Sequence, residues 1–229
     1  MTVDFATYCY SGDREKLYSN LIDHINSHNY QFDNIHLVHQ RCLPLYDNLP
    51  FGYSGAQLIY HQIAQDDYTT ILSNQGINPD NKEADEYTHG WNAPHYWKHH
   101  CVNHIVALHS SDAQYIVLSD ADCYMKNQPS SWVTKGIEIL KSDSSVLVVS
   151  PSDGGQERKT QTMSQQLFLC DRERLLSIDF DLPFEGFREG GPFQEYYFLL
   201  EGRIGRYMEK NNLFRYVMDP RFRYWHNQW

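Results

Sequence analysis

The sequence predicts an α/β protein in which a central, mostly parallel sheet is flanked by helices. Two apolar runs, residues 115–118 and 145–150, are typical of strands that are buried on both faces of a parallel sheet. Strand and helix also alternate near the start of the chain, which is how such a sheet begins. No internal repeat or low-complexity tract divides the 229 residues. We therefore expect a single domain over residues 1–229.

The first elements follow from simple periodicities. Residues 4–10 (DFATYCY) predict a strand, and residues 11–13 form a polar turn that can cap a helix. Residues 14–27 place Leu17, Leu21, Ile22 and Ile25 on one face, which predicts an amphipathic helix. Residues 34–39 (NIHLVH) predict a second strand. These elements open a parallel sheet.

The middle of the chain is less regular. We predict a helix over residues 52–63 and a strand over residues 68–73. Residues 75–94 are rich in Asn, Asp, Gly and Pro, which predicts a loop. Residues 94–108 begin with a proline and carry an apolar stripe, which predicts a helix. The apolar run at 115–118 then supplies the next buried strand.

The second half mixes strands, helices and glycine-rich loops. A helix is predicted over residues 130–141, with Ser130 at a plausible N-cap, and a strand over residues 145–150. The rest is predicted as a loop at 151–160, a strand at 166–170, a short helix at 171–176, a loop at 179–192, a helix at 194–208 and a strand at 214–218.

Composition narrows the class of protein. The net charge of −10 argues against binding to nucleic acid or to an anionic bilayer. No segment approaches the roughly 18 apolar residues of a membrane span, and the N-terminus does not resemble a signal peptide. The cysteines are odd in number and contain no C-x-x-C pair, which favours reduced thiols and a cytoplasmic protein; they are Cys9, Cys42, Cys101, Cys123 and Cys170.

Two carboxylates follow the most clearly predicted strand. Asp120 and Asp122, in the sequence SDAD, come directly after the apolar run at 115–118. Ligands of open α/β sheets bind just beyond the carboxyl ends of such strands. Carboxylate oxygens suit Mg²⁺ or Mn²⁺, and such an ion could bridge to a diphosphate. For the tripeptide alone, a solvated turn is the alternative.

Further features appear in a recognisable order. A first strand runs into a small polar turn at residues 8–13, and Asn103 lies on the helix before the SDAD strand. Glu195 lies in GGPFQEYYFLLEGR, and His226 lies in RFRYWHNQW. Together with the acidic motif, these residues make the chain similar to the GT-A glycosyltransferases, most of all to the inverting family-2 branch. The likeness spreads over nearly the whole chain.

The resemblance implies a Rossmann-like GT-A fold in one domain. Residues 1–125 would bind the nucleotide sugar, and residues 126–229 would bind the acceptor. The implied activity is metal-dependent, inverting transfer of a hexose or related sugar from a nucleotide sugar, with a UDP-linked donor favoured. The sequence does not identify the acceptor. The implied cofactor is Mn²⁺ or Mg²⁺.

The resemblance also assigns roles to the acidic motif and the late histidine. Asp122 is the principal metal ligand, and His226 completes the metal site. Asp120 contacts the ribose or the donor sugar and touches the metal through water. Glu195 is the base that deprotonates the acceptor hydroxyl. Its rivals for that role are Glu185, Glu189 and Glu201.

The residues expected to contact the donor follow from the motifs that match the family and from one position where this chain differs from it. Family members often have Arg-Asn where this chain has Val102 and Asn103, so another cation must meet the diphosphate. Guanidinium groups suit phosphate, which favours Arg221 and Arg223. The remaining residues predicted to contact the donor lie at the first strand and its turn: Tyr8, Tyr10 and Ser11.

Other readings stay open. His95 and His99, and His100 and His104, have the i, i+4 spacing of a helical zinc site, without the glutamate of H-E-x-x-H. The signatures of P-loop ATPases, dinucleotide-binding oxidoreductases and G-x-S-x-G hydrolases are absent from the sequence. A sugar nucleotidyltransferase has a similar fold but usually carries a glycine-rich basic loop near its start. A non-catalytic glycan- or protein-binding module on the same scaffold is the alternative from another class.

Overall fold

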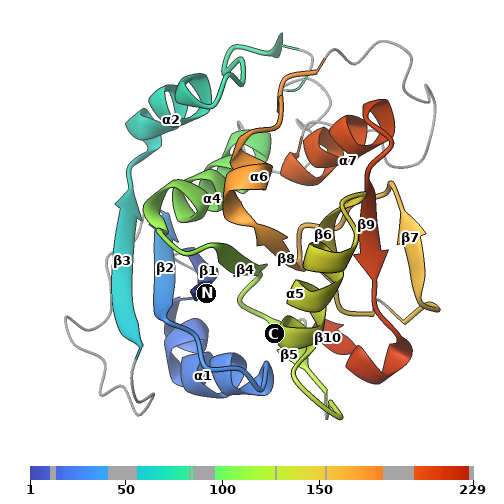
Figure 1. The fold of residues 1–229 in the computed structure, drawn as a ribbon. Helices are drawn as coiled ribbons and strands as arrows, with labels where there is room; N and C mark the ends of the chain where they lie inside the picture. The colour runs from blue at the N-terminus through green and yellow to red at the C-terminus, as the bar shows by residue number, and fades with distance from the viewer. Residues whose placement is uncertain are drawn as a thin grey trace.

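The computed structural model describes residues 1–10, 14–40, 56–82, 84, 96–126, 128–152, 154–182 and 199–226. Its main feature is an eight-stranded sheet in the order β3-β2-β1-β4-β8-β6-β9-β7 (Figure 1). Those strands are β1 (Val3–Tyr10), β2 (Asn34–Gln40), β3 (Gln57–Ile63), β4 (Tyr115–Ser119), β6 (Val146–Ser150), β7 (Arg158–Thr160), β8 (Leu167–Asp171) and β9 (Phe214–Val217). A separate two-stranded sheet pairs β5 (Cys123–Met125) with β10 (Tyr224–His226).

The described helices are α1 (Arg14–Ser27), α2 (Tyr68–Asn74), α4 (Tyr96–Ser110), α5 (Trp132–Ser142), α6 (Arg172–Leu176) and α7 (Leu200–Lys210). Two 3₁₀ turns, η1 (Gln65–Asp67) and η4 (Pro220–Phe222), precede α2 and β10. Within the described part of the chain, no helix is both long and apolar enough to cross a bilayer.

Parallel pairing in the first half of the chain brings the carboxyl ends of β1, β2 and β4 to the same edge of the sheet. β1 pairs in parallel with β2 on one side and with β4 on the other, so Thr7 lies opposite Ser119. After β1 the chain moves outward to β2 and β3, and only later returns to place β4 on the other side of β1. Strand order therefore reverses between β1 and β4. Open α/β sheets bind ligands at the carboxyl ends of such strands.

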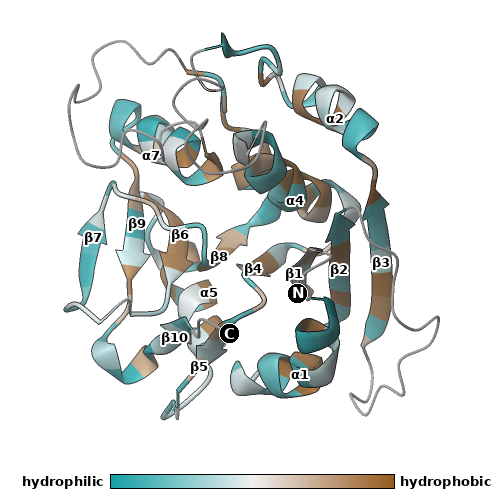
Figure 2. Cartoon of the chain, turned by 180° about the vertical axis from the view of Figure 1, so that it is seen from behind, coloured by the Kyte–Doolittle hydropathy of each residue, from teal (hydrophilic) through white to brown (hydrophobic). Residues whose placement is uncertain are grey.

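The sheet has a core on each face, which explains the continuous apolar strands. Alternate residues of one strand point to opposite faces: Phe5 joins the cluster under α1 and α5, and Ala6 joins the cluster under α2, α4, α6 and α7. Helices therefore cover both faces, as Figures 1 and 2 show, with apolar residues gathered on the central strands. The predicted α/β sandwich is confirmed.

The elements between β2 and α4 differ from the prediction. Where a helix was predicted over 52–63, the described residues form the strand β3, which pairs in parallel with β2. Where a strand was predicted over 68–73, the chain forms the helix α2. Ile59, Tyr60 and Ile63 have high strand propensity. In α2, Tyr68 and Leu72 are buried one turn apart, so helical packing overrides the β-branched threonines.

The second half follows the prediction with local shifts. Ser131, one residue after the predicted cap, accepts a hydrogen bond from the Thr134 backbone at the start of α5. Residues 158–160, predicted as loop, form the short strand β7 against β9. The helix predicted over 194–208 begins at Leu200 in the structure. Glu195 lies outside the described residues.

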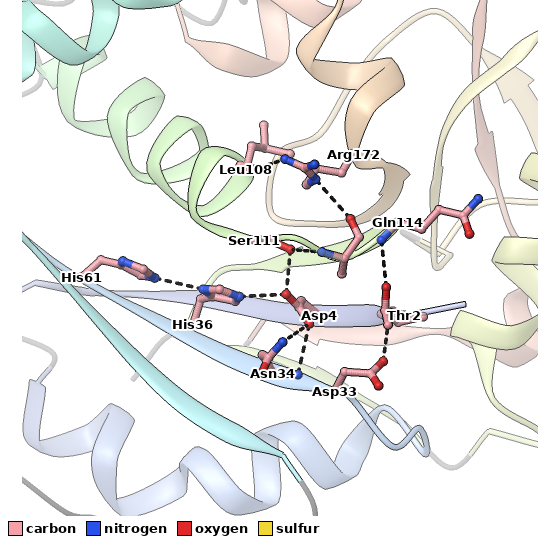
Figure 3. A network of polar contacts seen from close by, with 12 residues as sticks. Thr2, Asp4, Asp33, Asn34, His36, His61, Leu108, Ser111, Gln114 and Arg172 are labelled. Carbon is pink, nitrogen blue, oxygen red and sulfur yellow. Dashed lines mark hydrogen bonds and ion pairs between the residues drawn. The ribbon is translucent and has the colours of Figure 1, made fainter.

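A polar network ties the first strands together at the edge where β1 begins (Figure 3). The buried Asp4 carboxylate accepts hydrogen bonds from His36 Nε2 at 2.9 Å, Ser111 Oγ at 2.7 Å and the Asn34 backbone at 3.1 Å. His36 Nδ1 lies 2.9 Å from His61 Nε2 on β3. Burial alone would raise the pKa of Asp4, but the hydrogen bonds from His36 and Ser111 outweigh it and lower the pKa. The network links buried side chains of β1, β2 and β3, in addition to the backbone pairing of these strands.

Candidate functional site

The acidic motif occupies a tight turn at the carboxyl end of β4. β4 ends at Ser119, and the Asp120 backbone N–H donates to the Gln166 carbonyl at 2.7 Å, which anchors the motif to the segment before β8. The Cys123 backbone N–H then donates to the Asp120 carbonyl at 3.2 Å and closes the turn. The chain continues as β5. Both aspartates are thus placed just beyond the strand, at the sheet edge where strand order reverses.

The end of the chain returns to this turn as β10. β10 pairs antiparallel with β5, and His226 lies opposite Cys123. Asp122 immediately precedes Cys123, in the turn that leads into β5. The pairing brings the end of β10 beside this turn, and His226 Nε2 lies 3.1 Å from Asp122 Oδ1. Residues more than a hundred positions apart in the sequence meet here because the two short strands pair.

A four-residue cluster results. One potential ligand atom from each of Asp120, Asp122, Cys123 and His226 lies within 4.8 Å of the others. Among the described residues, this is the one group of three or more His, Cys, Asp or Glu side chains close enough to hold a metal ion. Sequence reasoning named three of its members and missed Cys123. The sequence shows that Cys123 follows Asp122, but it does not show that Cys123 pairs with His226. That pairing brings Cys123 into the cluster.

The electrostatics of the cluster favour a cation. Burial raises the pKa of Asp120 well above its ordinary value, and the nearby carboxylates of Asp122 and Glu201 raise it further. Burial and the same two aspartates raise the pKa of the Cys123 thiol, so the thiol stays protonated and is a poor ligand. Two carboxylates and an imidazole are a donor set that fits Mn²⁺ or Mg²⁺. A divalent ion there would relieve the repulsion between the carboxylates.

Glu201 adds a third carboxylate on the first turn of α7. Its Oε2 accepts a hydrogen bond from the Gln165 backbone N–H at 2.9 Å. Burial raises the pKa of Glu201 to about 7, against the opposing effects of that hydrogen bond and of Arg215. Glu201 was considered from sequence as a rival base. Gln165, which donates to Glu201, precedes Gln166, whose carbonyl accepts from the Asp120 backbone, so Glu201 is held close to the acidic motif.

The residues predicted to contact the donor lie in different settings. Tyr8 is 4% exposed and packs on the His104 ring with centroids 4.6 Å apart, which favours the core role over base stacking. Asn103 is buried on α4. Arg221 is exposed in η4 and its Nε lies 2.9 Å from Asp219 Oδ1. The exposed Arg223 lies beside the Trp225 ring, 5.5 Å from its centroid.

Three predicted site residues cannot be placed. Ser11 and Glu195 lie outside the described residues, and so does the side chain of Tyr10. The rival bases Glu185 and Glu189 lie there too. Their roles remain predictions.

The histidines considered for zinc have other partners. His99 Nδ1 lies 2.8 Å from the Tyr68 hydroxyl, and His100 Nδ1 lies 2.9 Å from Gln165 Nε2. His104 Nδ1 lies 2.9 Å from the His100 carbonyl oxygen, within its own helix. His95 lies outside the described residues. The described members are core and hydrogen-bonding residues, and no metal-ligand group is found among them.

Cys9, Cys101, Cys123 and Cys170 are all buried, and none of them forms a disulfide. Cys42 lies outside the described residues.

Comparisons with known proteins place the fold. No protein-family model and no curated protein sequence matches the chain. Among solved structures, TarS from S. aureus matches with a TM-score of 0.56 and 12% identity, over 100% of this chain and 37% of TarS. The TarS fragment 1–349 in complex with UDP-GlcNAc matches with a TM-score of 0.53 and 12% identity, over 100% of this chain and 59% of the fragment.

These similarities are likenesses of fold, because the identity is low. The chain spans just over a third of TarS and under two thirds of the fragment that was solved with UDP-GlcNAc. The α/β architecture, with its mixed, mostly parallel central sheet flanked by helices, matches the GT-A-like fold of TarS. The resemblance inferred from the sequence is therefore confirmed for the fold.

Proposed function

We propose that the protein is a metal-dependent glycosyltransferase that moves a sugar from a nucleotide sugar to an acceptor, with UDP as the nucleotide. One observation carries the proposal. In a GT-A fold, Asp120, Asp122 and His226 converge at the carboxyl end of β4, where strand order reverses. The TarS fragment that shares this fold was solved in complex with UDP-GlcNAc and also with UDP. A nucleotide sugar is thus the ligand class that this site supports best.

Asp122 and His226 would hold the divalent ion, with Asp120 beside them. When bound, Mn²⁺ or Mg²⁺ supplies a Lewis acid that stabilises the charge developing on the departing diphosphate. The net charge of −10 makes such local neutralisation necessary for an anionic donor. Asp120, which faces the same cluster, would also accept hydrogen bonds from the ribose or the donor sugar.

The chain's own cations complete the donor site in this proposal. Arg221 and Arg223 come just before β10, the strand that carries His226. Arg221 already meets one carboxylate, Asp219, and would exchange that contact for a diphosphate oxygen. Residues 1–125 would then supply most of the nucleotide site, with His226 contributed from the other half.

For the chemical step we propose an inverting mechanism with Glu195 as base. The carboxylate would take the acceptor proton as the hydroxyl oxygen attacks the anomeric carbon. Glu201 is the rival that the structure favours among the described residues. It stands in the first turn of α7, and its raised pKa of about 7 suits a base that works near neutral pH. Separate substitution of the two glutamates decides between them.

Two other functions remain as alternatives. A sugar nucleotidyltransferase would consume a nucleoside triphosphate and a sugar phosphate. A non-catalytic binding module would bind a glycan or protein and leave every nucleotide sugar intact. Incubation with a panel of nucleotide sugars and Mn²⁺, without acceptor, distinguishes a glycosyltransferase from the binding module, because slow donor hydrolysis is expected for a transferase. Formation of a nucleotide sugar from a nucleoside triphosphate and a sugar phosphate would identify the nucleotidyltransferase. Release of no nucleotide from any donor would favour the binding module.

A further inference from the structure

Gln166 lies at the junction of the metal site and β8. Its backbone carbonyl accepts the hydrogen bond from Asp120 that anchors the acidic turn. Its side chain reaches the other component of the site, β10. Oε1 accepts a hydrogen bond from the Tyr224 hydroxyl at 2.9 Å, and Nε2 lies 3.5 Å from His226 Nδ1. Gln166 thus contacts both the acidic turn and β10, the strand that carries His226.

The neighbouring Gln165 holds this segment in place. Its backbone N–H donates to Glu201, and its side-chain Nε2 lies 2.9 Å from His100 Nδ1. Its carbonyl oxygen lies 3.3 Å from His104 Nε2. The backbone that carries Gln166 is therefore fixed to α4 and α7. Rotation of the Gln166 amide about its last side-chain bond can still occur without moving this frame.

The proton positions give Gln166 a specific task. With the amide oriented as in the structure, Gln166 Nε2 can donate only to a His226 Nδ1 that carries no proton. In that neutral tautomer the ring proton is on Nε2, the atom that faces Asp122 Oδ1. A ligand nitrogen must offer its lone pair, so metal binding through Nε2 requires the proton on Nδ1. Nδ1–H then needs an acceptor. A half-turn of the Gln166 amide presents Oε1 to Nδ1–H, and Nε2 then donates to the Tyr224 hydroxyl oxygen.

We propose that Gln166 is a positioning residue for the metal ligand His226, whose metal-binding tautomer it fixes by accepting the Nδ1 proton. This inference rests on the proposed metal-dependent function and deepens it. Tyr224 supports the same task, because its hydroxyl can donate to one orientation of the amide and accept from the other. Metal-ligating histidines usually donate their second nitrogen to such an outer partner, and loss of the partner typically costs about 10- to 100-fold in affinity.

The test measures Mn²⁺ affinity by calorimetry, without any substrate. Gln166→Met keeps the length of the side chain and removes its hydrogen bonds, and the Kd for Mn²⁺ should rise at least about tenfold. Gln166→Glu restores an acceptor for Nδ1–H and should bind Mn²⁺ at least as tightly as wild type. The matched control is Gln75→Leu, which removes a second Gln–His pair, with His109, away from the cluster. It should leave the Kd unchanged.

A spectroscopic readout separates positioning from general damage. With Mg²⁺ bound, ¹⁵N spectra of the His226 ring should show the proton on Nδ1 in wild type and in Gln166→Glu. Gln166→Met should show a mixture of tautomers at the same Mg²⁺ concentration. An unchanged Mn²⁺ affinity in Gln166→Met, with binding lost in Asp122→Asn, overturns the positioning role and leaves the metal site intact. Absence of Mn²⁺ binding by the wild-type protein overturns both.

Discussion

Lowering the pH should unfold this protein through its buried histidines. His24 is fully buried, with Nε2 3.1 Å from the Ser119 hydroxyl, and burial lowers its pKa to about 4. His39 is equally buried beside the Tyr18 hydroxyl, and burial lowers its pKa to about 4 as well. The ordinary histidine pKa is 6.5. Both imidazoles are therefore neutral in the folded protein at a pH where the unfolded chain binds a proton.

The sign and size of the effect follow from linkage. Between the unfolded pKa of 6.5 and the folded pKa of about 4, the unfolded state binds more protons, so the free energy of unfolding falls as the pH falls. At pH 5 each histidine lies about 1.5 pH units below its unfolded pKa, which costs about 2 kcal/mol of stability. Two such residues remove about 4 kcal/mol, a large part of the total for a typical domain.

Urea denaturation at pH 7.5, 6 and 5 measures this loss directly. The matched variants are His24→Gln, which removes one buried imidazole, and His109→Gln, which removes an exposed one. His24→Gln should lower stability at pH 7.5 but reduce the drop between pH 7.5 and pH 5 by about 2 kcal/mol. His109→Gln should change that drop much less. A wild-type stability that stays constant from pH 7.5 to pH 5 would refute the reasoning.

Other predictions concern the site. Asp122→Asn should weaken Mn²⁺ binding by at least about a hundredfold in calorimetry, because one charge about 4 Å away is worth up to about 4 kcal/mol at a partly buried site; full activity of this variant, or of wild type in excess EDTA, would contradict the role of the metal. Removal of residues 226–229 should abolish turnover while circular dichroism and the unfolding midpoint change little, because chain ends seldom carry the fold; a truncated protein with wild-type turnover would show that His226 is dispensable. Glu195→Gln should keep donor Kd and lower transfer by at least about a hundredfold, since the amide cannot take a proton; normal turnover in Glu195→Gln, with loss in Glu201→Gln, would move the base to Glu201.

Much of the fold follows from local sequence patterns. β4 and β6 are buried on both faces, so each appears in the sequence as a continuous apolar run. α1 packs on a core through one face, so its apolar residues recur with the helical period. β3 and α2 were interchanged in the prediction. β3 is an edge strand with partly exposed residues, and α2 is short, so neither has a decisive periodicity.

The site was predictable in part, for a physical reason. Asp120 and Asp122 directly follow a buried strand, and this position can be read from the sequence because the strand is an apolar run. The meeting of His226 with Asp122 depends on pairing between β5 and β10, and the resemblance to a known family, not a local pattern, indicated it. Cys123 and Gln166 enter only through tertiary contacts. Nothing in the local sequence around Gln166, which precedes β8, indicates that its side chain contacts a metal ligand.

The central claim is that a metal ion held by the acidic motif and His226 recruits a nucleoside diphosphate group. Calorimetric titration with UDP, in Mn²⁺ and then in EDTA, tests it without knowledge of the sugar or the acceptor. We expect saturable UDP binding in Mn²⁺ that weakens at least about tenfold in EDTA and in Asp122→Asn. UDP binding of equal strength in all three conditions, or no binding of UDP in Mn²⁺, would contradict it.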